Sequence, residues 1–137
     1  MAAAVKKREV LPQTLPSRVK VAVYGTLKRG FGNHVLISRD KTARFDGNCV
    51  LAGYTMVSMG GFPAVAEVAG AGMIACEIWD VSCDTIPSLD ALEGHPNWYT
   101  RVQVDTAYGV AWIYLMPAEK ILDGRRPVVD KGVWIRS

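Results

Sequence analysis

The pattern of apolar and polar positions predicts strands along most of the chain. A segment that becomes apolar toward Tyr24 indicates a buried strand over residues 19–24. Residues 43–58 predict one or two strands with a bulge or bend, because glycines interrupt the pattern. Further strands are predicted over residues 64–68, 73–81, 99–106 and 110–116.

One segment, residues 84–93, clearly has the apolar spacing of a helix. Its inward stripe would consist of Ile86, Leu89 and Leu92, and Gly94 would end it. Shorter helical pieces are predicted at 34–38, with Asn33 as the N-cap, and at 119–122. Many strands and one clear helix predict an α+β domain, built as a barrel or a strongly curled sheet.

Glu93 is the main candidate for chemistry. It lies four residues after Leu89, which places it on or beside the apolar stripe, at the negative end of the helix dipole. Both surroundings disfavour the charged carboxylate, so the pKa of Glu93 should rise toward that of a general base at neutral pH. The alternative is a solvated residue on a frayed last turn. Asp90 is either an orienting neighbour or a surface carboxylate.

The strand ending at Tyr24 runs into a glycine-rich stretch over residues 25–34. Successive backbone N–H groups in such a turn can bind an anion. The glycine spacing is neither that of a phosphate-binding loop nor that of a dinucleotide fingerprint. An ordinary strand-to-turn transition is the alternative interpretation.

Length and composition narrow the function classes. The 137 residues fit a single domain over 18–137, preceded by a flexible arm over 1–17. A net charge of +3, from scattered basic residues, favours a solvated surface over nucleic-acid binding. The three cysteines and two histidines lack metal-site spacing, so neither a metal nor a cofactor is predicted. Without a secretory signal or a bilayer-spanning apolar run, the sequence predicts a cytoplasmic protein without membrane contact.

Four motifs occur in a fixed order: YGTLKRGFGNH over residues 24–34, LAGYTM over 51–56 with GFPA over 61–64, LDALEG over 89–94 followed by YTR over 99–101, and GVW over 132–134. Together they resemble the γ-glutamylcyclotransferase-like (AIG2-like) family, and most closely its γ-glutamylamine cyclotransferase branch. The resemblance covers about Val19 to Trp134. It departs at Cys76-Glu77, where many members have Gly-Glu.

This resemblance implies a small mixed β-barrel flanked by one or two helices. Glu93 would be the acid/base at the barrel mouth, and Tyr99 could hydrogen-bond at the cavity rim. A small-molecule γ-glutamyl amine or amide would be cyclised to 5-oxoproline with release of a free amine. The KRGxxNH motif favours γ-glutamylamines over glutathione. The substrate would be held by the loop residues Tyr24, Gly25, Thr26 and Leu27.

Two alternatives stay open. The chain could be a non-catalytic small-ligand-binding module of the same fold, although retention of Glu93 and the YGTL loop argues against this. It could also remove a γ-glutamyl protecting group in a biosynthetic or phage pathway. Neither the departing amine nor the oligomeric state is predicted by the sequence.

Overall fold

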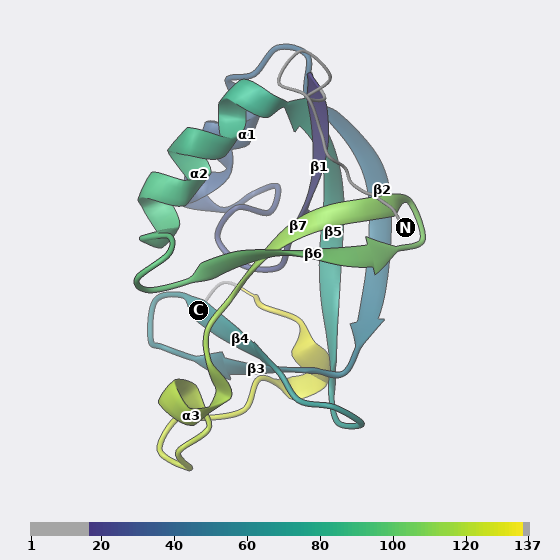
Figure 1. The fold of residues 1–137 in the computed structure, drawn as a ribbon. Coiled ribbons are helices and arrows are strands. Elements are labelled where there is room, and N and C mark those ends of the chain that lie inside the picture. The colour runs from purple at the N-terminus through teal and green to yellow at the C-terminus, as the bar shows by residue number, and fades with distance from the viewer. Residues whose placement is uncertain (1–16, 136–137) are drawn as a thin grey trace, which may run out of the picture.

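A five-stranded mixed sheet forms the centre of the computed structural model, which describes residues 17–135 (Figure 1). The strands lie in the order β2-β5-β1-β7-β6. β1 and β7 are parallel, and the other neighbours are antiparallel. A separate antiparallel pair joins β3 to β4. The strands are β1 (Arg18–Val23), β2 (Arg44–Ala52), β3 (Tyr54–Ser58), β4 (Pro63–Glu67), β5 (Met73–Ser82), β6 (Thr100–Thr106) and β7 (Gly109–Leu115).

The helices are few and short, and Figure 1 shows α2 on one flank of the sheet. They are α1 (Val35–Ser38), α2 (Ile86–Glu93) and α3 (Ala118–Ile121), with 3-10 turns over residues 32–34, 83–85 and 130–132. The Arg39 guanidinium, just after α1, donates a 3.0 Å hydrogen bond to the Ser88 hydroxyl of α2. No helix in residues 17–135 is both long and apolar enough to cross a membrane.

The alternation of side chains sorts the apolar residues into two cores, one on each face of the sheet. Val21 and Val23 of β1 belong to one core, which also contains Leu89 of α2. Ala22 of β1 belongs to the other core, together with Ile78 of β5. The parallel pairing of β1 with β7 and its burial on both faces explain why this strand is apolar at its end.

The predicted α+β class is confirmed, but the sheet is not closed into a barrel. Within residues 17–135, its edge strands β2 and β6 are not paired with each other. The β6–β7 turn instead leans toward β2, where the Tyr108 hydroxyl donates a 3.5 Å hydrogen bond to the Asn48 carbonyl. A Cβ atom added at Gly47 would clash with that hydroxyl, so this glycine permits the close approach.

Two details of the predicted helices are wrong. Asn33 is not an N-cap, because it lies inside the 3-10 turn and its side-chain amide donates to the Thr26 hydroxyl at 2.8 Å. Leu92 does not face inward and is 39% exposed, whereas Leu89 is fully buried. Residues six apart are separated by about 120° around a helix, so Ile86 and Leu92 cannot share one narrow stripe.

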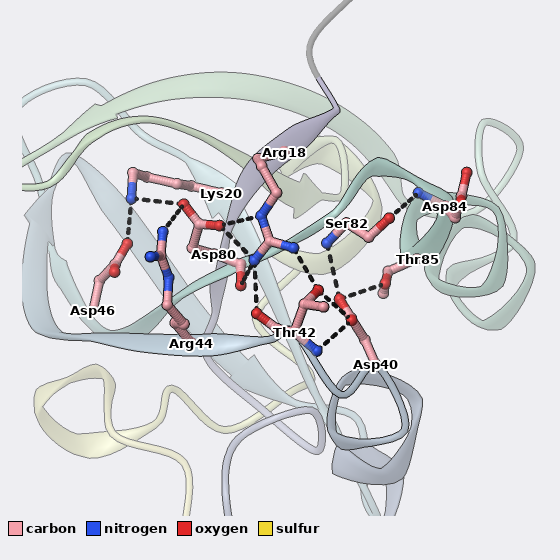
Figure 2. A network of polar contacts seen from close by, with 10 residues as sticks. All are labelled: Arg18, Lys20, Asp40, Thr42, Arg44, Asp46, Asp80, Ser82, Asp84 and Thr85. Carbon is pink, nitrogen blue, oxygen red and sulfur yellow. Dashed lines mark hydrogen bonds and ion pairs between the residues drawn. The ribbon is translucent and has the colours of Figure 1, made fainter.

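A network of charged side chains joins β1, β2 and β5 (Figure 2). At its centre Asp80, a buried residue of β5, lies 2.8 Å from Arg18, 3.3 Å from Lys20 and 3.5 Å from Arg44. Burial acts to raise the pKa of Asp80, but hydrogen bonds from Arg18 and Lys20 outweigh it and lower that pKa. No local pattern in the sequence predicts this network, because its members come from three different strands.

The predicted N-terminal arm over residues 1–17 lies outside the described residues except for Ser17. The carbonyl of Ser17 accepts a 2.9 Å hydrogen bond from the amide of Cys83.

Candidate active site

A cavity of about 280 Å³ lies where β1 enters the glycine-rich loop and α2 ends. Its walls come from residues 22–27 with Asn33, from the 61–63 loop, from residues 92–93 and 98–99, and from Tyr114 of β7. All the site residues predicted from the sequence line it, namely Tyr24, Gly25, Thr26, Leu27, Glu93 and Tyr99. The fold therefore brings together two motifs that are far apart in the chain.

Glu93 is the last residue of α2, and its half-buried side chain lines the cavity. Gly94 follows with a left-handed φ of 67°, which ends the helix at that point. No described residue donates a hydrogen bond or forms an ion pair with the Glu93 carboxylate. Burial raises the pKa of Glu93 to about 7. This carboxylate can therefore exchange a proton near neutral pH.

The first three residues of the glycine-rich loop, Gly25 to Leu27, use their carbonyl groups within the loop but not their N–H groups. Within the described part of the chain, the N–H groups of Gly25, Thr26 and Leu27 donate to no acceptor. Their carbonyl oxygens accept from the Lys28 amide at 3.0 Å, the Asn33 amide at 3.1 Å and Nδ1 of His34 at 2.8 Å. Three successive backbone donors on a cavity wall are an arrangement suited to an anion.

Three tyrosines form a buried and hydrogen-bonded wall. The hydroxyl of Tyr24 donates to the Tyr114 carbonyl at 2.6 Å, and the hydroxyl of Tyr99 donates to the Pro63 carbonyl at 2.8 Å. Burial raises the pKa of each of these phenols, so all three stay neutral. Tyr99 is only 4% exposed and thus lies in the wall rather than at the rim.

Asp90 positions two neighbours and makes no hydrogen bond to Glu93. Its carboxylate accepts from Nε and Nη2 of Arg101 at 2.8 and 3.1 Å, and from the hydroxyl of Tyr114 at 2.6 Å. Burial acts to raise the pKa of Asp90, but these hydrogen bonds outweigh it and lower that pKa. Asp90 is therefore held by three hydrogen bonds and stays ionised at neutral pH, whereas Glu93 can exchange a proton there.

The KRGxxNH residues mainly hold the loop in place. Asn33 fixes Thr26, and the ring of His34 packs on Trp79 of β5 with centroids 4.9 Å apart. Lys28 and Arg29 do not line the cavity. Lys28 donates to the Trp134 carbonyl at 2.9 Å, and the Arg29 guanidinium lies 4.0 Å from the centre of the Phe45 ring.

Several cavity residues were not anticipated from the sequence. Phe62 and Pro63 lie in the GFPA segment over residues 61–64, where the glycine and the proline indicate a loop but do not by themselves indicate a site. Trp98 and Leu92 line the cavity because α2 ends at Glu93 and the chain turns back. Tyr114 lies in a nearly continuous apolar strand, and its sequence context carried no signal.

Residues 21–136 match the family described as "Gamma-glutamyl cyclotransferase, AIG2-like". The chain therefore belongs to this family, as the motifs predicted. The chain is 28% identical to the gamma-glutamylcyclotransferase family protein YtfP of Escherichia coli K12. The aligned 117 residues cover 85% of this chain and 96% of the relative.

Solved structures agree with the fold. An uncharacterized protein of Pyrococcus horikoshii is 26% identical and superposes with a TM-score of 0.67 over 84% of this chain and 88% of that chain. An AIG2-like protein of Mus musculus is 24% identical and superposes with a TM-score of 0.70 over 85% of this chain and 88% of that chain.

Proposed function

We propose that the protein converts a γ-glutamyl amine or amide to 5-oxoproline and a free amine, with Glu93 as the general acid/base. One observation carries this proposal: a half-buried carboxylate, whose pKa is about 7, lines the same cavity as three residues with unused backbone N–H groups, and neither the carboxylate nor those N–H groups have a partner among residues 17–135. Family membership supports the reaction class.

The reaction needs one substrate and no water. The α-amino nitrogen attacks the γ-carbonyl carbon, a carbon–nitrogen bond closes the ring, and the original amide bond breaks. Glu93 would accept the first proton that the α-ammonium group loses and donate it to the departing nitrogen. The attacking nitrogen loses a second proton as the ring closes, and the departing amine takes it up and leaves as an ammonium ion. Both reacting groups belong to one molecule, so the protein mainly has to hold the folded pose.

The unused N–H groups of Gly25, Thr26 and Leu27 would bind the α-carboxylate or the developing oxyanion. No Lys or Arg is among the described residues that line the cavity, which makes these backbone donors the candidate anion site. The neutral rings of Tyr24 and Tyr99 would close the wall around the γ-glutamyl group. Among the described residues that line the cavity, Glu93 carries the only formal charge, and its carboxylate would lie against the ammonium group of the substrate.

The test is the release of 5-oxoproline from γ-glutamyl-ε-lysine, glutathione and γ-glutamyl-alanine. Glu93→Gln keeps the shape of the side chain and removes the base, so it should abolish release. Glu119→Gln is the matched control, because Glu119 is an exposed carboxylate of α3 away from the cavity. Equal release by wild type and Glu93→Gln would reject Glu93 as the base.

The same experiment separates the alternatives. Binding of a γ-glutamyl ligand without release by wild type would favour the non-catalytic binding module. Release from a γ-glutamyl-blocked intermediate alone, and from none of the simple amides, would favour the removal of a protecting group.

A further inference from the structure

The cavity changes in character from its inner wall to its mouth. Val23, Tyr24 and Tyr114 on the inner wall are each at most 7% exposed. On the outer side, Trp98 is 53% exposed and Leu92 is 39% exposed, and the half-buried Phe62 ring lies beside them. Large apolar side chains that are exposed together at a cavity mouth are typical of a binding surface.

The position of Trp98 is fixed by the turn that ends α2. Its amide donates to the Gly94 carbonyl at 2.9 Å, and its ring contacts Tyr99 edge-on with centroids 6.1 Å apart. The Phe62 ring approaches from the opposite loop, with its centroid 6.1 Å from that of Trp98. The two rings thus form a pre-positioned aromatic surface rather than two independent exposed residues.

Charge and volume limit what can occupy this mouth. Glu93 is the only charged residue among those that line the cavity in the described chain. A carboxylate on the departing group would therefore find no positive partner there, and a second ammonium group would find only Glu93, which already serves the α-ammonium group of the substrate. The cavity, about 280 Å³, is just below the ~300–1,000 Å³ of common ligand sites. A γ-glutamyl group held on the inner wall, between Glu93 and the N–H groups of the glycine-rich loop, would leave the amine substituent at the mouth.

We propose that Leu92, Phe62 and Trp98 form the subsite for the departing amine, and that this amine carries an uncharged apolar substituent, preferably an aromatic one. This inference rests on the proposed cyclotransferase function and names the substrate class of the same site.

The test compares kcat/KM for 5-oxoproline release from four probes: γ-glutamyl-phenethylamide, γ-glutamyl-ethylamide, γ-glutamyl-ε-lysine and glutathione. The phenethylamide should exceed the ethylamide at least about tenfold, since burial of even one added methylene in an apolar pocket changes kcat/KM by ~10–200-fold. Its kcat/KM should also exceed those of both charged probes. Equal kcat/KM values for the phenethylamide and the ethylamide, or a higher value for a charged probe, would overturn the subsite while leaving the proposed function intact. Release from none of the four would overturn both.

Two variants assign the preference to the mouth. Trp98→Ala should reduce the phenethylamide-to-ethylamide ratio several-fold. Leu92→Lys, at an exposed helix position that tolerates a charge, should raise the rate with glutathione relative to the ethylamide. Ile135→Ala is the matched control, because Ile135 is an apolar side chain, 69% exposed, outside the cavity. The subsite would be contradicted if Trp98→Ala left the phenethylamide-to-ethylamide ratio unchanged and Leu92→Lys left the glutathione-to-ethylamide ratio unchanged. If Trp98→Ala fails to fold, the Leu92→Lys result alone decides.

Discussion

Gly25 and Pro63 touch across the cavity wall: a Cβ atom added at Gly25 would lie 2.6 Å from Cγ of Pro63. The contact joins the glycine-rich loop after β1 to the start of β4. Pro63 also accepts the hydrogen bond from the Tyr99 hydroxyl, so three segments meet at this point. Glycine is needed here for close approach and not for an unusual backbone angle.

Gly25→Ala should therefore disturb the site. The proline ring is rigid, so one wall has to move, which should cost about 1–3 kcal/mol of unfolding free energy and most of the 5-oxoproline release. Gly32→Ala is the matched control, because nothing lies within 4 Å of a Cβ at Gly32. Urea denaturation and the release assay measure the two effects. A Gly25→Ala variant with wild-type stability and rate would show that the contact is not required.

The rate should depend on pH through Glu93. Burial raises the pKa of this carboxyl to about 7, and the proposed base is its ionised form. kcat/KM should therefore rise about tenfold per pH unit below pH 7 and level off above it. The measurement is a pH profile of 5-oxoproline release with the ethylamide probe. A profile that is flat between pH 5 and 8 would contradict a base with this pKa.

The same residue should reduce stability at alkaline pH. The pKa of Glu93 is about 7 in the folded chain and near its ordinary value of 4.5 in the unfolded chain, so the folded state holds the extra proton between these values. Stability then falls as the pH rises from about 4.5 to 7. Glu93→Gln removes this loss and should be more stable than wild type by about 2 kcal/mol at pH 8, after allowance for partial solvent exposure. At pH 4 the two proteins should unfold alike. Urea denaturation at both pH values gives the comparison, and equal stability at pH 8 would contradict the burial of this charge.

The sequence predicted what local patterns determine and missed what depends on partners distant in the chain. Apolar spacing predicted the helix that ends at Glu93, and glycines predicted the loop after Tyr24. The open sheet was not predicted, because whether β2 and β6 are edge strands depends on long-range pairing. Asn33 looked like a cap in its local context, yet the tertiary fold turns its side chain to Thr26. Tyr114 in the cavity wall depends on the parallel pairing of β1 and β7, which no local pattern contains.

Tyr114→Phe should weaken the support of the cavity without removing the proposed base. The variant loses the 2.6 Å hydrogen bond to the Asp90 carboxylate, and a hydrogen bond to a charged group contributes about 1.5–3 kcal/mol. Because Arg101 still binds Asp90, the fold should be retained. The pH at which the rate is half-maximal should stay near that of wild type. Tyr108→Phe is the control, since its 3.5 Å bond lies on an exposed turn. If the denaturation curves of Tyr114→Phe and Tyr108→Phe coincide, the hydrogen bond from Tyr114 does not stabilise the cavity wall.

The Asp80 network should matter for stability, with a defined pH dependence. Asp80→Ala leaves Arg18, Lys20 and Arg44 without the carboxylate they share, so the variant should lose about 3 kcal/mol. The folded-state pKa of Asp80 lies below its ordinary value, so its contribution is complete above the unfolded pKa of ~3.9 and is lost as the pH falls toward the folded value. The loss caused by Asp80→Ala should accordingly be large at pH 7 and smaller at pH 3. Asp84→Ala, at an exposed carboxylate in the 3-10 turn before α2, is the control and should change stability little at either pH. A loss of the same size at pH 3 and pH 7 would mean that packing of the side chain, and not its charge, stabilises this part of the sheet.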